Sequence, residues 1–334
     1  MRIGFIMPTV TVSYSGGVAV QGRMWKEGLE NLGHECFLIN QWDKFDLASY
    51  DYIIFLGMGR LVWDYASVYK KMFPKTKLIY APIIDPIVSV KKFHLRAKYY
   101  GSRKLHLRKD LHDIYMSRNY FDFYLARSEF EKKYIVGGFD IPEDKVYIVP
   151  LSMRINQKIA FDLSSKGDYC LHISRLSAPG KNVSGLIKAA RKYGFKLRLA
   201  GTLPPGGKNW LKDQIGNATN IEYIGWLTDE QLIEEYKKAR VFALPSFVEG
   251  VGMVALEAAA FGADIVLTDI GAPKEYYKGR ATLVDPYDID SIGKGVMYAL
   301  NHTKQPELSK FILDNYSLNV NSKQLADVMF KNLN

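Results

Sequence analysis

The chain has 334 residues, 48% of them are apolar, and the formal net charge at pH 7 is +10. This length exceeds that of a typical single domain, so we expect two domains with separate cores. The apolar content excludes a disordered chain, and no apolar stretch is long enough to span a bilayer as a helix. The positive charge favours acidic partners, such as a nucleotide diphosphate, an anionic lipid surface or a nucleic acid.

Two cysteines, Cys36 and Cys170, lie in apolar, strand-like runs. We expect them in different domains, and their spacing matches no zinc site, so neither a disulfide nor a bound zinc ion is predicted. Unpaired cysteines fit a reducing cytoplasm. The first residues form a strand pattern rather than the long apolar run of a signal peptide. A cytoplasmic protein is therefore predicted, with peripheral attachment to the inner face of the membrane left open.

The first half of the chain alternates apolar runs with helical patterns, which is typical of βαβ units around a parallel sheet. A helix is expected over residues 20–32. Strands are expected at residues 2–7, 35–40, 52–57, 77–82 and 146–150, with a further strand, turn and helix start within 123–130. In that last segment Ser128 is the expected N-cap, with Glu131 as the acid three residues later.

A loop from Pro8 to Val18 carries the pair Gly16 and Gly17. Glycine pairs let a backbone approach a ligand closely. The loop lacks the G-x-G-x-x-G fingerprint of dinucleotide-binding proteins, so nicotinamide or flavin binding is not predicted. A plain flexible loop is the alternative interpretation.

The stretch from Lys91 to Lys109 is strongly basic and contains no acid. Gly101 is expected to divide it. Beyond that glycine one helical stripe is predicted from Lys104, Arg108 and His112, beside an apolar stripe of Leu107, Leu111 and Ile114. A basic stripe next to an apolar one is how an interfacial helix lies on an anionic membrane. The alternative is that the leucines face the core and the cations are solvated.

The second half of the chain restarts the alternation after a connector at residues 151–166. Strands are expected at residues 169–174, 196–201, 221–226, 241–244, 265–268 and 282–284, and helices at 229–239, 288–301 and 306–333. His172, inside the first of these strands, is interpreted as a structural core residue.

Two cations, Arg175 and Lys181, flank the loop after that first strand. Such a pair at the end of a strand suits a diphosphate, because arginine offers a planar fork of donors and lysine a point charge. A solvated turn with two surface charges is the alternative.

The most informative stretch runs from residue 244 to residue 262. A strand leads into a turn that contains Glu249, and the helix that follows ends at Gly262. Open α/β sheets bind ligands at such strand-to-helix turns, where bare N–H groups attract anions. Glu257 lies inside the apolar helix, where a carboxylate is costly to bury unless it is paired. The alternatives are a partly exposed Glu257 and a plain capping role for Glu249.

The run from Ser246 to Gly262 has a glutamate, seven residues, a second glutamate and an alanine-rich helix. It resembles the signature of the retaining nucleotide-sugar glycosyltransferases of family 4 (GT4, glycosyltransferases group 1). Residues 268–275 are similar to the strand and turn that follow it in that family. The loop from Arg175 to Lys181 resembles the family's diphosphate clamp, with one residue more between the two bases. The resemblance implies the α/β GT-B fold, with two Rossmann-like domains whose parallel sheets face each other across a cleft.

The same resemblance implies roles for single residues. Glu249 would contact the donor sugar, Glu257 the ribose hydroxyls of the nucleotide, and Arg175 and Lys181 the diphosphate. The family has a histidine that touches the donor sugar near residues 80–90; this chain has none there, and Asp85 is the candidate for its place or for an acceptor contact. The remaining donor-binding candidates are Gly16 and Gly17 near the phosphates or the acceptor, Trp226 and Leu227 against the base, and Gly250, Val251, Gly252 and Met253 at the helix start.

The implied activity is metal-independent transfer of a hexose, with retention, from a UDP- or GDP-sugar to a hydroxyl of a glycan or lipid-linked acceptor. It would serve the synthesis of cell-surface polysaccharide, lipopolysaccharide or glycolipid. No cofactor is implied. The pair Asp288 and Asp290 has the spacing of a metal-binding D-x-D motif, but it lies at a helix start and is interpreted as a cap.

The predicted domains are an acceptor-side domain at 1–150, the connector at 151–166 and a nucleotide-sugar domain at 167–318, with a helix at 319–334 packing back on the first domain. Three other functions stay open: a nucleotide-sugar epimerase or hydrolase of the same fold, a catalytically silent partner subunit, and a phage-type enzyme that glucosylates DNA. The positive charge suits the last of these.

Overall fold

The computed structural model describes residues 1–8, 16–40, 44, 46–58, 60–102, 105, 107–155 and 159–333. The chain divides into two compact units. The amino-terminal unit comprises Met1–Arg154 and Leu318–Asn334, and the carboxy-terminal unit comprises Ile155–Ser317.

The amino-terminal unit is built on a six-stranded sheet with the order β2-β1-β3-β4-β5-β6. All neighbouring strands in it are parallel. The strands are β1 (Arg2–Ile6), β2 (Glu35–Leu38), β3 (Tyr52–Leu56), β4 (Lys77–Ala81), β5 (Phe123–Ala126) and β6 (Val146–Ile148). The helices are α2 (Gly17–Asn31), α3 (Arg60–Met72), α4 (Val90–Tyr99), α5 (Asp110–Ser117), α6 (Glu129–Phe139) and α13 (Leu318–Lys331).

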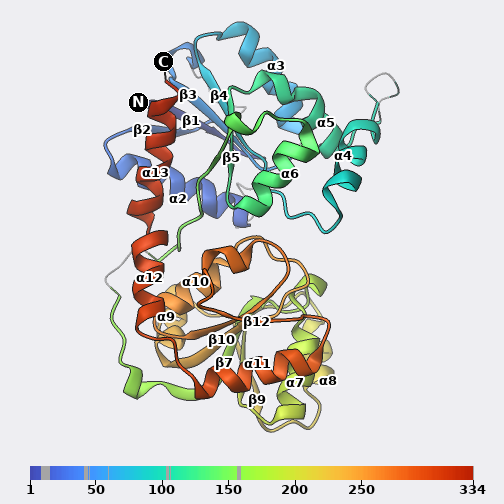
Figure 1. Ribbon diagram of the computed structural model, residues 1–334, viewed down its shortest axis with the longest axis vertical. Helices are drawn as coiled ribbons and strands as arrows, with labels where there is room; N and C mark the ends of the chain where they lie inside the picture. The colour runs from blue at the N-terminus through green and yellow to red at the C-terminus, as the bar shows by residue number, and fades with distance from the viewer. Residues whose placement is uncertain are drawn as a thin grey trace. The chain divides into compact units, whose positions relative to one another are not determined.

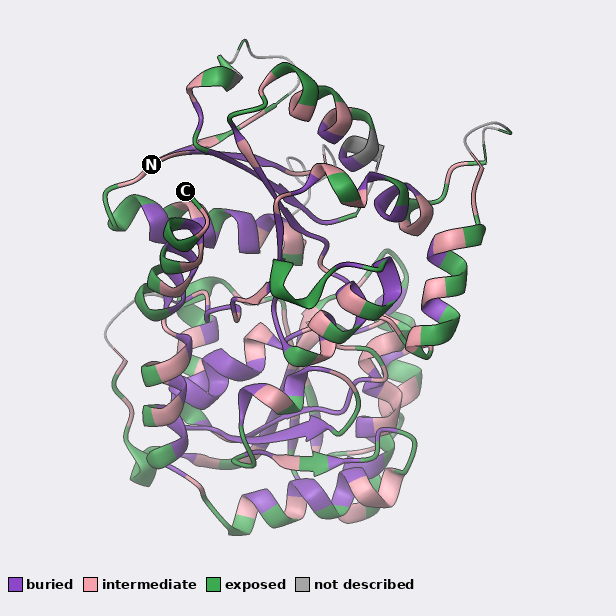
Figure 2. Ribbon diagram, turned by 45° about the horizontal axis from the view of Figure 1, so that its top comes forward, coloured by how far each residue is buried: buried purple, intermediate pink, exposed green. Residues whose placement is uncertain are grey.

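Successive residues of a strand point to opposite faces of its sheet, so a central strand supplies two cores. In β3, Ile53 and Phe55 belong to one buried cluster, and Tyr52, Ile54 and Leu56 belong to the other. Every residue of this strand is buried. Figure 2 shows the central strands of the sheet in the colour of buried residues. The continuous apolar run in the sequence is therefore the mark of a strand covered on both faces.

The last helix of the chain, α13, completes one of these two cores. Its Leu325 and Met329 are fully buried in the cluster that also holds Trp25 and Leu29 of α2. Figure 1 shows α13 and α2 side by side. A Cβ at Gly28 would collide with Ser322 of α13, so the close approach of the two helices requires glycine at this position.

The carboxy-terminal unit has a second six-stranded parallel sheet, with the order β12-β11-β10-β7-β8-β9. Its strands are β7 (Gly167–Arg175), β8 (Leu197–Thr202), β9 (Ile221–Gly225), β10 (Ala239–Leu244), β11 (Asp264–Thr268) and β12 (Thr282–Val284). Its helices are α7 (Val183–Tyr193), α8 (Gly207–Ile215), α9 (Asp229–Lys238), α10 (Met253–Ala260), α11 (Ile289–Asn301) and α12 (Glu307–Tyr316).

The strand order of this second sheet indicates where a ligand can bind. The chain enters at β7, continues outward through β8 and β9, and then returns to the other side of β7 with β10. Loops leaving β7 and β10 therefore run in opposite directions from neighbouring strands, and ligands of open α/β sheets bind in the crevice that this opens. The expected α/β class with two parallel sheets is confirmed.

Two of the helix predictions are wrong. The helix expected over residues 306–333 is two helices, α12 and α13, separated at Ser317, where the chain passes from one unit to the other. The helical stripe predicted beyond Gly101 does not form. Leu107 forms a β-bridge with Ser102, and α5 begins only at Asp110.

The members of that predicted stripe have other partners. Arg108 pairs with Asp64 at 2.8 Å and with Asp113 at 3.4 Å, and the His112 ring bonds to the Ala97 carbonyl at 2.9 Å. Lys104 lies outside the described residues. The spacing of these residues in the sequence suggested a helical stripe. In the structure, the ion pairs of Arg108 and the hydrogen bond of His112 to neighbouring elements fix these side chains instead.

Candidate active site

The loop after β7 is anchored at both of its ends. Arg175 is the last residue of β7 and is exposed, whereas Leu176 beside it is buried in the core. The Leu176 amide donates to the Thr202 carbonyl at the end of β8. Lys181 lies at the other end of the loop, with 23% of its side chain exposed. The two cations predicted to clamp a diphosphate therefore flank a fixed loop at the carboxyl edge of the sheet.

Asn182 ties three loops together at this edge. It adopts a left-handed backbone conformation, with φ of 53°, directly before α7. Its side-chain amide donates to the carbonyl of Pro245 at 3.0 Å and to that of Pro286 at 2.7 Å. Asparagine tolerates this conformation better than most residues. The sequence offered no signal for this role beyond a polar residue next to Lys181.

The loop after β10 is bonded to the loop after β7. The amides of Phe247 and Val248 both donate to the carbonyl of Gly180, at 2.8 and 3.3 Å. The Phe247 ring also stacks on Tyr287, with ring centroids 4.8 Å apart. These contacts bring the two predicted motifs, more than sixty residues apart in the sequence, to one place at the switch point of the sheet.

Glu249 and Lys181 form the central ion pair of this site. The Lys181 ammonium lies 2.7 Å from Oε2 of Glu249, and the Ser246 hydroxyl donates to the same oxygen at 3.1 Å. Only 10% of the glutamate side chain is exposed. Helix α10 has no side-chain cap and no acid in its first turn, so the alternative of Glu249 as a plain capping acid is wrong.

The start of α10 leaves backbone donors at the same edge. Its N-cap is Gly252, which has φ of 74° and ψ of 51°. Glycine adopts this left-handed conformation without steric cost. The first amides of an α-helix have no partner within the helix and carry partial positive charge. The predicted segment Gly250 to Met253 thus presents N–H groups next to the Lys181–Glu249 pair.

Glu257 lies inside α10 and is closed to solvent, with 1% of its surface exposed. The Tyr236 hydroxyl of α9 donates to its Oε2 at 3.0 Å. The alternative of a partly exposed Glu257 is therefore wrong, and the need for a hydrogen-bonding partner is met as expected.

His172 lies in β7 and is fully buried, with its ring turned to the neighbouring strand β10. Its Nδ1 bonds to the Ala243 carbonyl and its Nε2 to the Ser174 hydroxyl, both at 2.8 Å. Because a carbonyl only accepts, Nδ1 carries the proton and Nε2 accepts from the serine. Burial lowers the pKa of His172 to about 4. The residue is a neutral core histidine, as the sequence suggested.

Several predicted residues lie elsewhere. Trp226 and Leu227 follow β9 at the edge of the second sheet, and the Trp226 side chain is exposed. Gly16 is the N-cap of α2 and Gly17 its first residue, so both belong to the amino-terminal unit, as does Asp85. Ser15, in the same predicted loop, lies outside the described residues.

The D-x-D pair at the start of α11 has the expected capping role. Asp288 is the N-cap, and its carboxylate accepts from the Asp290 amide at 2.8 Å. Asp290 in turn pairs with Lys192 and accepts from the Tyr193 hydroxyl. Both carboxylates are therefore engaged in fixing helix ends.

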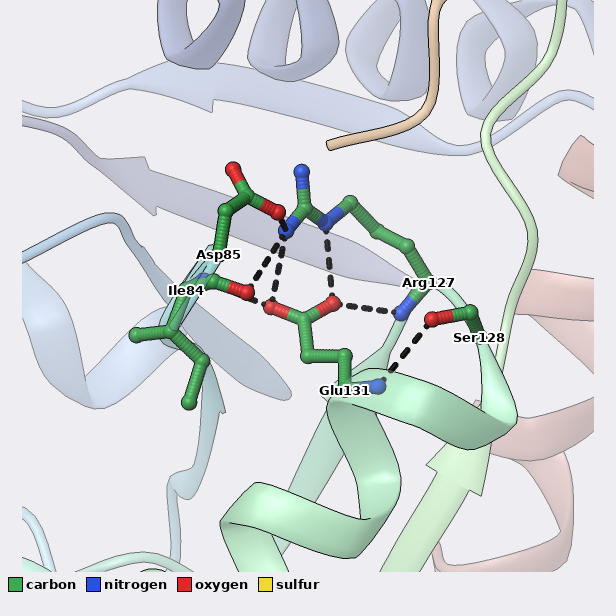
Figure 3. A network of polar contacts seen from close by, with 5 residues as sticks. All are labelled: Ile84, Asp85, Arg127, Ser128 and Glu131. Atoms are coloured by element: carbon green, nitrogen blue, oxygen red, sulfur yellow. Dashed lines mark hydrogen bonds and ion pairs between the residues drawn. The ribbon is translucent and has the colours of Figure 1, made fainter. Parts of the chain in front are cut away.

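Asp85 lies in a network that the sequence did not reveal (Figure 3). Its Oδ1 accepts from Nη2 of Arg127 at 2.8 Å. Arg127 also pairs with Glu131, the residue predicted only as an acid in the first turn of α6. The expected cap is present as well, since the Ser128 hydroxyl accepts from the Glu131 amide.

Comparison with known proteins finds a family that the second half of the chain matches. Residues 154–312 match the family described as glycosyl transferases group 1. The O-antigen chain mannosyltransferase B of Escherichia coli is 26% identical over 228 residues, which are 62% of this chain and 58% of that protein. An uncharacterized glycosyltransferase of Methanocaldococcus jannaschii is 30% identical over 216 residues, 55% of each chain. The chain thus matches little more than half the length of these relatives.

Solved structures share the fold over the whole chain. A lipopolysaccharide outer core galactosyltransferase, WaaB, aligns with a TM-score of 0.74 at 18% identity and covers 99% of each chain. A glycosyltransferase from Rickettsia africae aligns with a TM-score of 0.73 at 16% identity, over 99% of this chain and 98% of its own. At this identity the likeness shows the GT-B fold. Among the helices that the structure describes, none has both the length and the apolar character needed to cross a membrane.

Proposed function

We propose that this chain, a protein of GT-B fold whose residues 154–312 match the family described as glycosyl transferases group 1, transfers a sugar from a nucleotide-diphosphate sugar to a hydroxyl acceptor. The acceptor class proposed is a glycan of a cell-surface polysaccharide or lipopolysaccharide. Two observations on relatives support this choice, the O-antigen mannosyltransferase and the outer core galactosyltransferase. The proposed donor is a UDP- or GDP-linked hexose, and no cofactor is needed.

The observation that carries the proposal is the Lys181–Glu249 pair at the switch point of the carboxy-terminal sheet. Transfer leaves negative charge on a diphosphate. A cation and bare helix amides already fixed in place stabilise such charge without reorganising during the reaction. Lys181, Arg175 and the start of α10 supply these groups at one edge. Glu249, held by Lys181 and Ser246, supplies a carboxylate next to them.

The proposed mechanism retains the configuration at the sugar. The bond from the anomeric carbon to the diphosphate oxygen breaks, and the bond to the acceptor oxygen forms on the same face. The acceptor proton passes to the departing phosphate oxygen, so no separate base is required. Glu249 orients the sugar and favours the positive charge that develops on it. Charge neutralisation by Lys181, Arg175 and backbone dipoles leaves no need for a metal ion in this proposal.

The proposed nucleotide contacts are Glu257 for the ribose and the segment after β9, Trp226 and Leu227, for the base. The exposed indole of Trp226 is available for such a contact. Glu257 is buried and accepts from the Tyr236 hydroxyl, so the proposed ribose contact requires this carboxylate to become accessible. Mutagenesis therefore has to test this contact separately from that of Glu249.

The experiment that tests the function is a donor screen. The full chain is incubated with UDP- and GDP-hexoses, with GDP-mannose and UDP-galactose first, and with simple α-glycosides as acceptors; released nucleotide and product are quantified. We expect release that depends on the acceptor, an α-linked product and little effect of a chelator. Equal turnover of donor alone would indicate an epimerase or hydrolase, and an inverted product or a strict need for added Mg²⁺ would contradict the mechanism.

We also propose that the amino-terminal unit contacts an anionic membrane through α4 and the segment after it, although not through the helix that the sequence suggested. Lys91, Lys92 and Arg96 are exposed on α4. The apolar side chains of Leu95 and Leu107 are exposed nearby in sequence, by 46% and 58%. Cations beside exposed apolar groups are complementary to an anionic lipid surface.

A further inference from the structure

The carboxy-terminal unit contains a cavity of about 530 Å³ beside the outer strand of its sheet. One wall is helix α8 with the glycine that ends it, and the other wall is strand β9. The two elements follow each other in the chain, so the cavity is a groove between a helix and a strand. The proposed function assigns no ligand to this groove.

Strand β9 ends the sheet on this side. In the part of the chain that the structure describes, it pairs with β8 and with no other strand. The backbone of such an edge strand presents N–H and C=O groups that can bond to an added strand. Native proteins often cover an edge of this kind with a helix or a loop. Here a groove adjoins the edge instead.

Helix α8 presents one regular stripe to the groove. Lys208, Leu211, Lys212 and Ile215 recur at i, i+3, i+4 and i+7, which is one face of a helix. Leu211 is 2% exposed and Ile215 is partly buried, whereas both lysines are exposed. The groove therefore has an apolar floor with two cations beside it. Both charged residues of its lining are lysines, so its lining carries a positive charge.

Strand β9 is irregular where it borders the groove. Between Tyr223 and Gly225 it holds one residue more than β8, and that residue is Ile224. A regular strand turns successive side chains to opposite faces, and a bulge re-aims one of them. This irregularity accounts for Tyr223 and Ile224 both lining the groove. The Tyr223 hydroxyl donates to the Gly201 carbonyl at 3.0 Å, which fixes its ring in the wall.

The geometry of the two walls suits an extended peptide. A peptide that adds to an edge strand gains affinity from main-chain hydrogen bonds and selectivity from the pockets for its side chains. Lys208 and Lys212 are one helical turn apart, a rise of about 6 Å. Two side chains on one face of an extended chain, two residues apart, are separated by about 6.6 Å. Two acidic residues with this spacing therefore match the two lysines.

We propose that this groove binds an extended acidic segment of a partner protein, which adds to β9 as a further strand of the sheet. Two carboxylates of the segment pair with Lys208 and Lys212. An apolar side chain next to them packs on Leu211 and Ile215. This inference is independent of the proposed function, because the groove takes no part in the sugar transfer.

Peptide binding to the full chain tests the inference. The probes are blocked, fluorescently labelled peptides X-Thr-Glu-Thr-Glu, in which X is valine, leucine or phenylalanine, and anisotropy measures their affinity. We expect binding that weakens with added salt. Glutamine in place of both glutamates should weaken it about fivefold, because exposed ion pairs are individually weak. Methylation of the alternate peptide nitrogens that face β9 should weaken it about tenfold, since main-chain hydrogen bonds are lost.

Two pairs of substitutions locate the peptide. Lys208→Gln combined with Lys212→Gln should weaken binding about fivefold. Lys188→Gln combined with Lys238→Gln is the matched control, because both are exposed lysines on helices of the same unit and neither lines the groove. Thermal unfolding establishes that each variant is folded. In the wild type, bound peptide should slow hydrogen exchange at residues 221–225 more than in the other strands of this sheet.

Five outcomes would overturn the inference. They are no binding of any of the three peptides, equal binding of the glutamine or of the N-methylated form, equal losses from the two lysine pairs, and exchange protection away from β9. The fifth concerns nucleotide, because Gly225 in the groove lies next to Trp226, the proposed base contact. UDP and GDP are therefore titrated with and without peptide. Competition between them would make the groove a part of the donor site.

Discussion

The two units hold polar side chains at their strand ends in different ways, although each sheet has six parallel strands. In the carboxy-terminal unit, backbone groups do most of the holding. Asn182 bonds to two carbonyls, and the carbonyl of Gly180 receives two amides. In the amino-terminal unit, the buried ion pair of Arg127 and Glu131 holds the loop after β4 and the exposed Asp85 that this loop carries. The loops of the carboxy-terminal unit should therefore keep their conformation when a charged side chain is removed. The loop of the amino-terminal unit should lose its conformation.

The largest effect is expected at Glu131. Its replacement by alanine leaves Arg127 without its buried partner and releases the Ile84 amide. Breaking a buried ion pair in this way costs about 3–5 kcal/mol of unfolding free energy. Chemical denaturation of the full chain measures it. Glu129→Ala, an exposed acid in the same helical turn, should cost less than about 1 kcal/mol. Equal losses for the two variants would remove the distinction between the units.

Lys181→Ala should instead damage binding while the fold remains. Removing one partner of a desolvated charged contact weakens binding by on the order of 2–5 kcal/mol. Isothermal titration with UDP and GDP, alone and sugar-linked, measures the affinity, and denaturation measures stability. Lys188→Ala, an exposed lysine of α7, is the control. Unchanged donor affinity in the Lys181 variant would place the diphosphate elsewhere.

Glu249→Gln should lower the rate while nucleotide still binds. Loss of one stabilising group in a preorganised site reduces kcat by roughly 10²–10³. Glu257→Gln should have the opposite pattern, with weaker binding of bare nucleotide, because its proposed partner is the ribose. Steady-state kinetics and nucleotide titration separate the two. The same defect in bare-nucleotide binding from both changes would contradict this division.

Acid should lower the free energy of unfolding of the carboxy-terminal unit through His172. Its pKa is lowered from 6.5 to about 4 by burial. The unfolded chain then binds a proton between these values that the folded chain does not bind, so stability falls as pH drops from 6.5 toward 4. The loss amounts to about 3 kcal/mol at its limit. Denaturation at pH 7 and pH 4.5 of the wild type and of His172→Asn measures it. An equal pH dependence in both proteins would assign the effect to other groups.

The smallest effect concerns the membrane contact that we propose for the amino-terminal unit. Each lysine near an anionic bilayer contributes about 1 kcal/mol. The double change of Lys91 and Lys92 to glutamate should therefore reduce flotation with phosphatidylglycerol vesicles at low salt. Lys323→Glu, on exposed surface of α13, is the control. Wild-type protein that stays entirely off the vesicles would leave α4 as a solvated face.

The strands and the main motif followed from the sequence alone. Runs such as Tyr52 to Leu56 are apolar throughout because both faces of the strand are covered, and this pattern is visible without a structure. Glu249, Glu257, Arg175 and Lys181 were singled out by their places around strand ends, and their roles came from the resemblance to a family signature. The cap at Ser128 was predicted from the glutamate three residues later, Glu131. These are local features, in which near neighbours in the sequence decide the outcome.

Tertiary structure decided which side chains meet. Nothing in the sequence pairs Asp85 with Arg127, since the two are 42 residues apart and become neighbours only through adjacent strands β4 and β5. The same holds for Asn182, whose partners follow β10 and β12. The predicted basic helix failed for a related reason. Helical spacing at Arg108 and His112 competes with an ion pair to Asp64 and a bond to Ala97, and such long-range contacts outweigh a local pattern.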